Sequence, residues 1–183
     1  YNDNVKIYDI EKIHKWKNRM TQIYENYIST FNIDQLVNTD VESMRSFFNP
    51  GKNQVLDELD NKVKNIKNTI KKIAEDFPID VTISFNKKTG YAFKTSPKKF
   101  ATLKSCLKSH CDKDSDLLMK FCYKGKKFKI YHHELVTRNL KTTVEFTFRH
   151  LQKFNDTVLN LWQNMSTTMM KQYKIVTEKY YRK

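Results

Sequence analysis

The sequence predicts a mainly α-helical fold with a small β insertion, in which long antiparallel lever helices carry a four-stranded antiparallel sheet at their tip. Three observations support this prediction. A heptad stripe of apolar residues runs through 56–77, a second helical stripe runs from 140 to 180, and two β-hairpin patterns lie between the stripes. We therefore divide the chain into core and lever helices at 1–77, a β subdomain with basic hairpins at 78–132, and a returning lever helix at 133–183.

The first 50 residues are expected to form helices. Between residues 10 and 31 apolar residues recur at steps of three and four, which is typical of an amphipathic helix. They are Ile10, Ile13, Trp16, Met20, Ile23, Tyr27 and Phe31. Residues 41–48 are expected to form a further short helix, which the turn-forming Asn49-Pro50-Gly51 ends.

The next segment has the most regular helical pattern in the chain. Its apolar residues step by three and four in strict alternation, which is the a/d seam of a coiled coil. They are Leu56, Leu59, Val63, Ile66, Ile70, Ile73 and Phe77. Pro78 ends this helix, because a proline disfavours the α conformation at the residue before it.

Two pairs of β runs follow. Residues 79–85 alternate apolar and polar side chains, residues 86–90 form a turn in which Gly90 adopts a positive φ, and residues 91–94 form the return strand. The second pair is 118–123 and 127–131, around the turn Lys124-Gly125-Lys126. We expect the two hairpins to pack into one four-stranded sheet, with residues 97–116 forming a loop that contains one short helical piece.

The last segment is predicted to be one long helix. From Glu134 onward there is no glycine or proline, and apolar residues recur at helical spacing. The stripe comprises Leu140, Val144, Phe148, Leu151, Val158, Trp162, Met165, Met169, Tyr173, Val176 and Tyr180. Its expected partner is the heptad helix ending at Phe77, running antiparallel.

Charge is the most informative feature of the composition. Lys and Arg number 34 against 20 acids, a formal net charge of +14. The excess is concentrated, because residues 87–129 contain 13 lysines and three acids. A basic patch of this density indicates a polyanionic partner, of which nucleic acid is the usual one. Lysine makes point-charge contacts with phosphate, whereas bidentate reading of bases favours arginine.

The hairpin turns supply the candidate binding residues. Lysines at both turns are expected to contact the phosphates of one DNA duplex without reading its sequence, and neighbouring polar side chains add neutral hydrogen bonds. The predicted DNA-binding residues are Asn86, Lys87, Lys88, Thr89, Lys98, Lys99, Lys124, Lys126 and Lys127. The alternative is that these lysines only keep exposed turns solvated.

Three motifs in the same order resemble the lever and clamp region of the MutS mismatch-repair family. The first is Gly51 to Asp60, with Leu56-Asp57-Glu58 at a helix start. The second is Phe85-Asn86, three spacer residues and Gly90-Tyr91. The third is the aromatic-rich Phe128 to Leu135, which ends in Glu134-Leu135. His132-His133 departs from the family pattern before Glu134, and residues 97–116 are longer than the corresponding bacterial loop.

The resemblance implies that this chain is a fragment holding the clamp-like β subdomain and its levers. In that family, paired levers close two clamps around duplex DNA, and a distant ATPase moves the levers. The chain itself is therefore expected to be no enzyme and to hold no cofactor, with ATP and Mg bound elsewhere in the parent protein. The resemblance further implies that the full-length protein is a dimer. We expect it inside the cell wherever DNA is maintained, in a nucleus, an organelle or a viral replication site.

Two other functions fit the same residues. A helical scaffold would use its coiled coil to bind another protein, with the lysines as solvating charges. A single-strand binder would stack bases on aromatic residues of the sheet, although such residues more often form a core. The stacking candidates are Tyr91, Phe93, Phe100, Phe121, Tyr123, Phe128 and Tyr131.

The remaining candidates for chemistry are weak. The residues Cys106, His110, Cys111, Cys122, His132 and His133 lack the usual zinc-knuckle spacing, so no metal is expected. The three cysteines are expected to be free thiols in a reducing compartment. Asp57, Glu58 and Asp60 fit the acidic first turn of a helix better than an active site. No phosphate-binding loop is present, and no apolar run of 18 residues predicts a membrane span.

Overall fold

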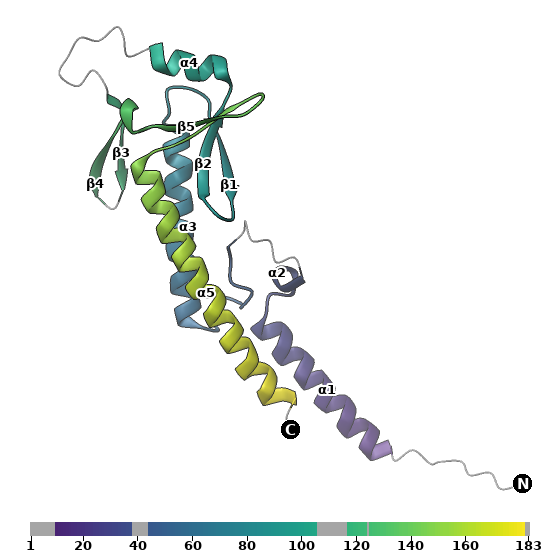
Figure 1. Ribbon diagram of the computed structural model, residues 1–183. Coiled ribbons are helices and arrows are strands. Elements are labelled where there is room, and N and C mark those ends of the chain that lie inside the picture. The colour runs from purple at the N-terminus through teal and green to yellow at the C-terminus, as the bar shows by residue number, and fades with distance from the viewer. Residues whose placement is uncertain (1–9, 38–43, 106–116, 124, 182–183) are drawn as a thin grey trace, which may run out of the picture. The chain divides into compact units, whose positions relative to one another are not determined.

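The computed structural model describes residues 10–37, 44–105, 117–123 and 125–181 (Figure 1). It combines helices with antiparallel β structure, as the sequence predicts. The chain divides into two compact units, Tyr1–Asp57 with Ser166–Lys183 and Glu58–Met165. Two helices, α3 (Gln54–Glu75) and α5 (Arg149–Tyr181), contribute residues to both units. In the described residues, no helix is long and apolar enough to cross a membrane.

The first unit contains α1 (Ile10–Thr30), α2 (Ile33–Val37) and an aromatic core. Phe31 is 1% exposed and lies 4.9 Å from Phe48 and 5.4 Å from Tyr173 of α5, measured between ring centroids. The predicted helix at 41–48 is wrong for its described part, residues 44–48. Phe48 pairs with Phe31 in a β-bridge, and Met44 has a φ of +44°, which a right-handed helix excludes.

The heptad stripe of α3 is confirmed as a buried face. Leu56, Val63, Ile66, Ile70 and Ile73 are each at most 3% exposed. The helix begins after Asn53, whose side chain accepts a hydrogen bond from the Leu56 N–H. Asp57 lies in the first turn of this helix, where its carboxylate accepts a hydrogen bond from the Gly51 N–H at 2.9 Å.

Both predicted hairpins exist, but they do not form one sheet. The strands β1 (Thr82–Asn86) and β2 (Gly90–Thr95) belong to a four-stranded sheet of order β1-β2-β6-β5. The strands β3 (Leu117–Tyr123) and β4 (Lys126–Tyr131) form a separate two-stranded ribbon. Between the hairpins lies α4 (Pro97–Ser105), the short helical piece expected in that region.

The prediction of one helix from residue 133 is also wrong. A 3₁₀ turn, η1 (His132–Glu134), leads into β5 (Val136–Asn139) and β6 (Val144–Thr147), and the helix begins only at Arg149. Val144, Phe146 and Phe148 alternate with Glu145 and Thr147, which is strand periodicity. Phe146 lies opposite Phe93 of β2 and is 1% exposed, so burial against the sheet selects the strand.

The sheet packs along the helices and is not carried at a helix tip. The Asn155 side chain, in the second turn of α5, bonds to the Tyr91 backbone next to the β1–β2 turn. The hairpin therefore runs back beside α5. An aromatic core joins the sheet to residues flanking the helices, since Phe77 lies 5.3 Å from Phe93 and 5.5 Å from Phe146.

Candidate nucleic-acid interface

The β1–β2 turn presents two adjacent lysines on a fixed backbone. Asn86 Oδ1 accepts a hydrogen bond from the Lys88 N–H at 2.8 Å, an Asx turn that holds the tip in one conformation. Gly90 has a φ of +82°, which closes the turn without side-chain strain. Lys87, Lys88 and Thr89 are exposed. Their polar ends therefore point into solvent from a preorganised turn.

The β3–β4 turn is basic as well. Lys126 and Lys127 open β4 and are exposed, whereas Lys124 lies outside the described residues. In the described part of the chain, no acid forms an ion pair with Lys87, Lys88, Lys126 or Lys127. These ammonium groups are thus available to an external anion.

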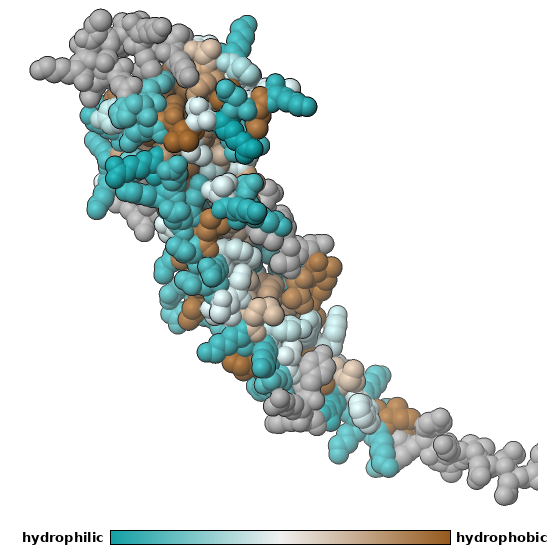
Figure 2. Space-filling view, viewed as in Figure 1, coloured by the Kyte–Doolittle hydropathy of each residue, from teal (hydrophilic) through white to brown (hydrophobic). Residues whose placement is uncertain are grey.

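The two turns lie at the same end of their hairpins. Figure 1 shows the β1–β2 and β3–β4 hairpins running in the same direction, with both turns toward the lower side of the β region in that view. Figure 2 shows hydrophilic side chains over both hairpins on the face in view. The two tips thus lie on the same side of the β region, although they belong to different sheets (Figure 1).

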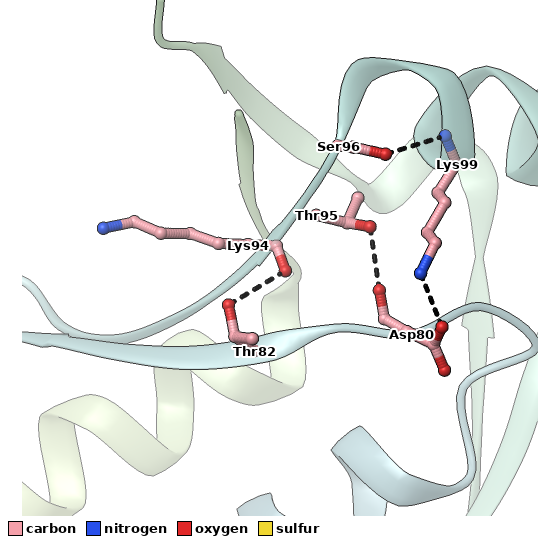
Figure 3. Close-up of polar contacts among 6 residues, drawn as sticks. All are labelled: Asp80, Thr82, Lys94, Thr95, Ser96 and Lys99. Atoms are coloured by element: carbon pink, nitrogen blue, oxygen red, sulfur yellow. Dashed lines mark hydrogen bonds and ion pairs between the residues drawn. The ribbon is translucent and has the colours of Figure 1, made fainter. Parts of the chain in front are cut away.

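The lysines of α4 differ from each other. Ser96 caps the helix, accepting a hydrogen bond from the Lys99 N–H at 3.3 Å, and Pro97 occupies the first helical position (Figure 3). The Lys99 ammonium donates to the Asp80 carboxylate. This hydrogen bond, together with the charge of Lys99, lowers the pKa of the Asp80 carboxyl below its ordinary value of 3.8. Lys98 is exposed and makes no ion pair with a described acid.

Cross-strand contacts neutralise one further lysine of the basic segment. Lys94 of β2 lies opposite Glu145 of β6, with Nζ 3.7 Å from the carboxylate. Thr82 donates to the Lys94 carbonyl at 3.3 Å, and Thr95 donates to the Asp80 carbonyl at 2.8 Å (Figure 3). Lys94 and Lys99 thus already have acidic partners within the fold, whereas Lys87, Lys88, Lys126 and Lys127 have none among the described residues.

The aromatic residues serve mainly as core. Tyr91, Phe93, Phe100 and Phe121 are at most 8% exposed, so their rings offer no stacking surface, while Phe128 and Tyr131 are half-buried. The side chain of Tyr123 lies outside the described residues. Three zinc candidates, Cys106, His110 and Cys111, also lie outside them, and the described part contains no cluster of three metal-ligating side chains.

Sequence reasoning missed Lys120 and Lys129 as candidate phosphate ligands. The structure places them opposite each other on β3 and β4, both exposed. The alternation of Lys127 and Lys129 with apolar residues already indicates a basic strand face, but only the register shows that Lys120 joins it. No protein-family model matches this chain, and no curated protein is similar enough to it to count as a match.

Proposed function

We propose that this chain binds the phosphate backbone of duplex DNA without reading its sequence, through the two lysine-bearing hairpin tips. The observation that carries the proposal is the exposure of Lys87, Lys88, Lys126 and Lys127 at two turns on the same side of the β region, without a described acidic partner. Lysine contacts with phosphate release counterions and provide most of the affinity in sequence-independent binding.

We further propose that the chain is the clamp and lever part of a MutS-like mismatch-repair protein. Support comes from the three motifs quoted above and from the two basic hairpins, which lie between the long helices α3 and α5 together with α4, β5 and β6. The helices α3 and α5 contribute residues to both units and would act as the levers. At 1.5 Å per residue, the 33 residues of α5 give a length of about 50 Å. Mismatch reading, ATP hydrolysis and dimerisation would belong to other parts of the parent protein.

The experiment is a comparison of nucleic acids at equal salt. Fluorescence anisotropy would measure the binding of a matched duplex, a duplex of unrelated sequence, a duplex with one mismatch, and a single strand of the same length. We expect equal affinity for the three duplexes and weaker binding to the single strand. Preference for the single strand, or a sequence preference above about tenfold, would contradict the proposal.

The matched protein variants separate the hairpin tips from net charge. The tip variant carries Lys87→Ser, Lys88→Ser and Lys126→Ser. The control variant carries Lys15→Ser, Lys62→Ser and Lys64→Ser, which removes the same charge from exposed positions of α1 and α3. We expect duplex affinity to fall at least tenfold in the tip variant and to change little in the control. Equal losses in both variants would mean that only net charge matters.

A helical scaffold is the second candidate function, and one observation favours it. The α1 helix exposes an apolar stripe, with Ile13 52%, Trp16 64% and Met20 56% exposed. Apolar side chains aligned on one helix face are typical of a partner-binding surface. This candidate predicts that the tip variant keeps full function in the parent protein, whereas Trp16→Ser abolishes it.

A further inference from the structure

The strand β1 forms one edge of the four-stranded sheet, and β2 is its one neighbour among the described strands (Figure 1). An edge strand presents a row of backbone N–H and C=O groups without ladder partners, and proteins usually protect such an edge with a charge, a proline or a bulge. The sequence of β1 is TISFN, which contains no charge and no proline, and its register with β2 is regular. This edge therefore lacks the usual protection.

The bonds of Tyr91 show which β1 residues face the open edge. In an antiparallel ladder, the N–H and C=O of one residue point to the same side, and successive residues alternate between the two sides. Both backbone groups of Tyr91 bond to the Asn155 side chain and not to Phe85, the residue opposite Tyr91 on β1. The backbone groups of Phe85, and by alternation those of Ile83, therefore point away from β2.

The β5–β6 turn leads to the same assignment. The Leu140 N–H donates to the Thr143 carbonyl, so Thr143 directs its backbone groups toward β5. Alternation along β6 then directs the groups of Phe146 toward β2, where Phe93 lies opposite. Phe93 thus bonds to β6 and leaves Ile83, its neighbour on β1, facing the open edge. Among the described residues, no group outside the β1–β2 ladder bonds to the backbone of Ile83.

The apolar layer beneath the sheet is incomplete at this edge. Ile83 and Phe93 lie opposite each other, so their side chains share the face on which Phe77 packs, 5.3 Å from Phe93. Phe93 is 0% exposed, whereas Ile83 is 39% exposed. The layer is therefore closed over β2 and open at β1.

A groove of about 430 Å³ lies where the layer is open. The acids that line it already have lysine partners, since Glu75 lies 3.9 Å from Lys71 and Asp80 accepts a hydrogen bond from Lys99. The rest of the lining is mostly apolar, so the groove suits an uncharged side chain. The apolar lining residues are Ala74, Phe77, Ile79, Val81 and Ile83.

An extended segment that pairs with β1 would use both the backbone edge and the groove. The segment residues opposite Ile83 and Phe85 would form the missing ladder hydrogen bonds, and their side chains would lie on the groove side of the sheet. Alternate residues of the segment should therefore be apolar. The end of the segment beside the β1–β2 turn would meet the exposed Lys87 and Lys88, which favours an acidic residue there.

A second copy of β1 fits this edge less well. Two β1 strands can pair antiparallel through Ile83 and Phe85. Val81 would then lie opposite Lys87 of the second copy, which brings a charge to the apolar groove. Phe85 of the second copy would stay on its own Tyr91, 4.9 Å away between ring centroids, and would leave the groove unfilled. The groove therefore favours a segment of a different protein.

We propose that the β1 edge binds an extended segment of a partner protein by strand addition. Alternate apolar side chains of the segment occupy the groove, and an acidic residue lies beside Lys87. This inference goes beyond the proposed function and does not depend on it, because the pairing requires no nucleic acid. The assays below therefore contain none.

The first test measures amide hydrogen exchange of the full chain by NMR. The probe is the synthetic peptide Glu-Glu-Thr-Val-Thr-Val-Thr-Val, and the control peptide Glu-Glu-Thr-Thr-Thr-Val-Val-Val has the same composition without the alternation. In the free protein, we expect the Ile83 and Phe85 amides to exchange rapidly and the Ser84 amide slowly, because only Ser84 bonds to β2. The probe should slow exchange at Ile83 and Phe85 by about tenfold or more, and the control peptide should not.

The second test blocks the site from two different elements. Ile83→Lys places a charge at the groove, and Ala74→Gln places an amide in it from α3 while leaving β1 unchanged, so a misfolded hairpin cannot explain both results. Each variant should weaken probe affinity by about tenfold or more. Ser84→Lys adds the same charge on the opposite face of β1 and should keep affinity within about twofold of wild type.

The possible failures are distinguishable. If the probe leaves the Ile83 and Phe85 amides unprotected, or if the control peptide protects them equally, strand addition at this edge is disproved. Protection in the free protein that grows with protein concentration would show a second copy at the edge and would overturn the assignment to a different protein. A failure to bind duplex DNA would overturn the proposed function alone.

Discussion

The side-chain amide of Asn155 bonds to both backbone groups of Tyr91. Its Oδ1 accepts from the Tyr91 N–H and its Nδ2 donates to the Tyr91 carbonyl, each at 2.8 Å. Asn155 is 3% exposed, and Tyr91 is the second residue of β2, next to the lysine-bearing turn. One residue of α5 thus substitutes for a neighbouring strand and fixes where the β1–β2 hairpin lies against the helix.

Replacing Asn155 should therefore loosen the hairpin. Asn155→Ala leaves a buried backbone donor and acceptor without their partner, at a cost of about 2–3 kcal/mol in the free energy of unfolding. Urea denaturation measures this loss. Asn160→Ala, at an exposed position of the same helix, is the matched control and should stay within about 0.5 kcal/mol of wild type. An equally small effect at Asn155 would show that the amide does not hold the hairpin.

Alanine substitutions at Gly90 and Gly125 can be compared directly, because the two glycines have similar backbone conformations. Both have positive φ, +82° and +73°. A Cβ at Gly90 would lie 2.5 Å from Asn155 Cγ, whereas nothing lies within 4 Å of a Cβ at Gly125. Gly125→Ala should cost only the backbone strain, about 1–2 kcal/mol. Gly90→Ala should cost clearly more, and Asn155→Ala should relieve part of the excess. Equal costs at the two glycines would contradict the close contact.

The contact between His150 and the ribbon predicts a pH dependence of stability. Burial lowers the pKa of His150 below 6.5, with Lys153 and Arg149 acting in the same direction and Glu134 opposing them. His150 therefore binds a proton more readily in the unfolded chain than in the folded one. Its contribution to the free energy of unfolding is fully present above pH 6.5 and is lost as the pH falls from there through the pKa of the folded state.

Urea midpoints measured between pH 5 and pH 8 test this dependence. The comparison is with His150→Gln, which removes only this titratable group and whose profile should be flatter than wild type below pH 6.5. A wild-type profile that rises toward lower pH relative to the variant would contradict the direction of the pKa shift.

Two neighbouring lysines of α4 predict unequal effects on DNA binding. Lys99 is paired with Asp80, whereas Lys98 has no described acidic partner. A phosphate would have to compete with Asp80 for Lys99. We expect Lys98→Ala to reduce duplex affinity more than Lys99→Ala at low salt. Asp80→Asn should free Lys99 and increase affinity; a decrease would contradict this view of the pair.

Local patterns in the sequence predicted the hairpins and the start of the heptad helix, because the alternation and the stripe are set by neighbouring residues. The pairing of β2 with β6 could not be predicted this way, since it joins Phe93 to Phe146 across 53 positions of the chain. Leu140, Val144 and Phe148 fit a helical step of four, yet Val144 and Phe148 also fit a strand. Burial of Phe146 decides between them.

The candidate site likewise has residues that the sequence predicted and features that only the structure shows. The lysine-rich turns follow from turn chemistry and composition, so Lys87, Lys88, Lys126 and Lys127 were predictable. The neutralisation of Lys99 in α4 depends on Asp80, 19 residues earlier, and the position of Lys120 depends on the strand register that places it opposite Lys129. Both depend on which separate segments of the chain come together, and composition does not determine that.

Binding of duplex DNA by the hairpin tips is best tested by measuring duplex affinity as a function of salt concentration. The wild-type protein, the tip variant and its charge-matched control are compared with one duplex. We expect the removal of Lys87, Lys88 and Lys126 to make the slope of log K against log salt shallower by about 2.7, at about 0.9 for each lost phosphate contact, while the control keeps the wild-type slope. A tip variant with the wild-type slope would mean that the DNA contacts another surface, and binding by the hairpin tips would be disproved.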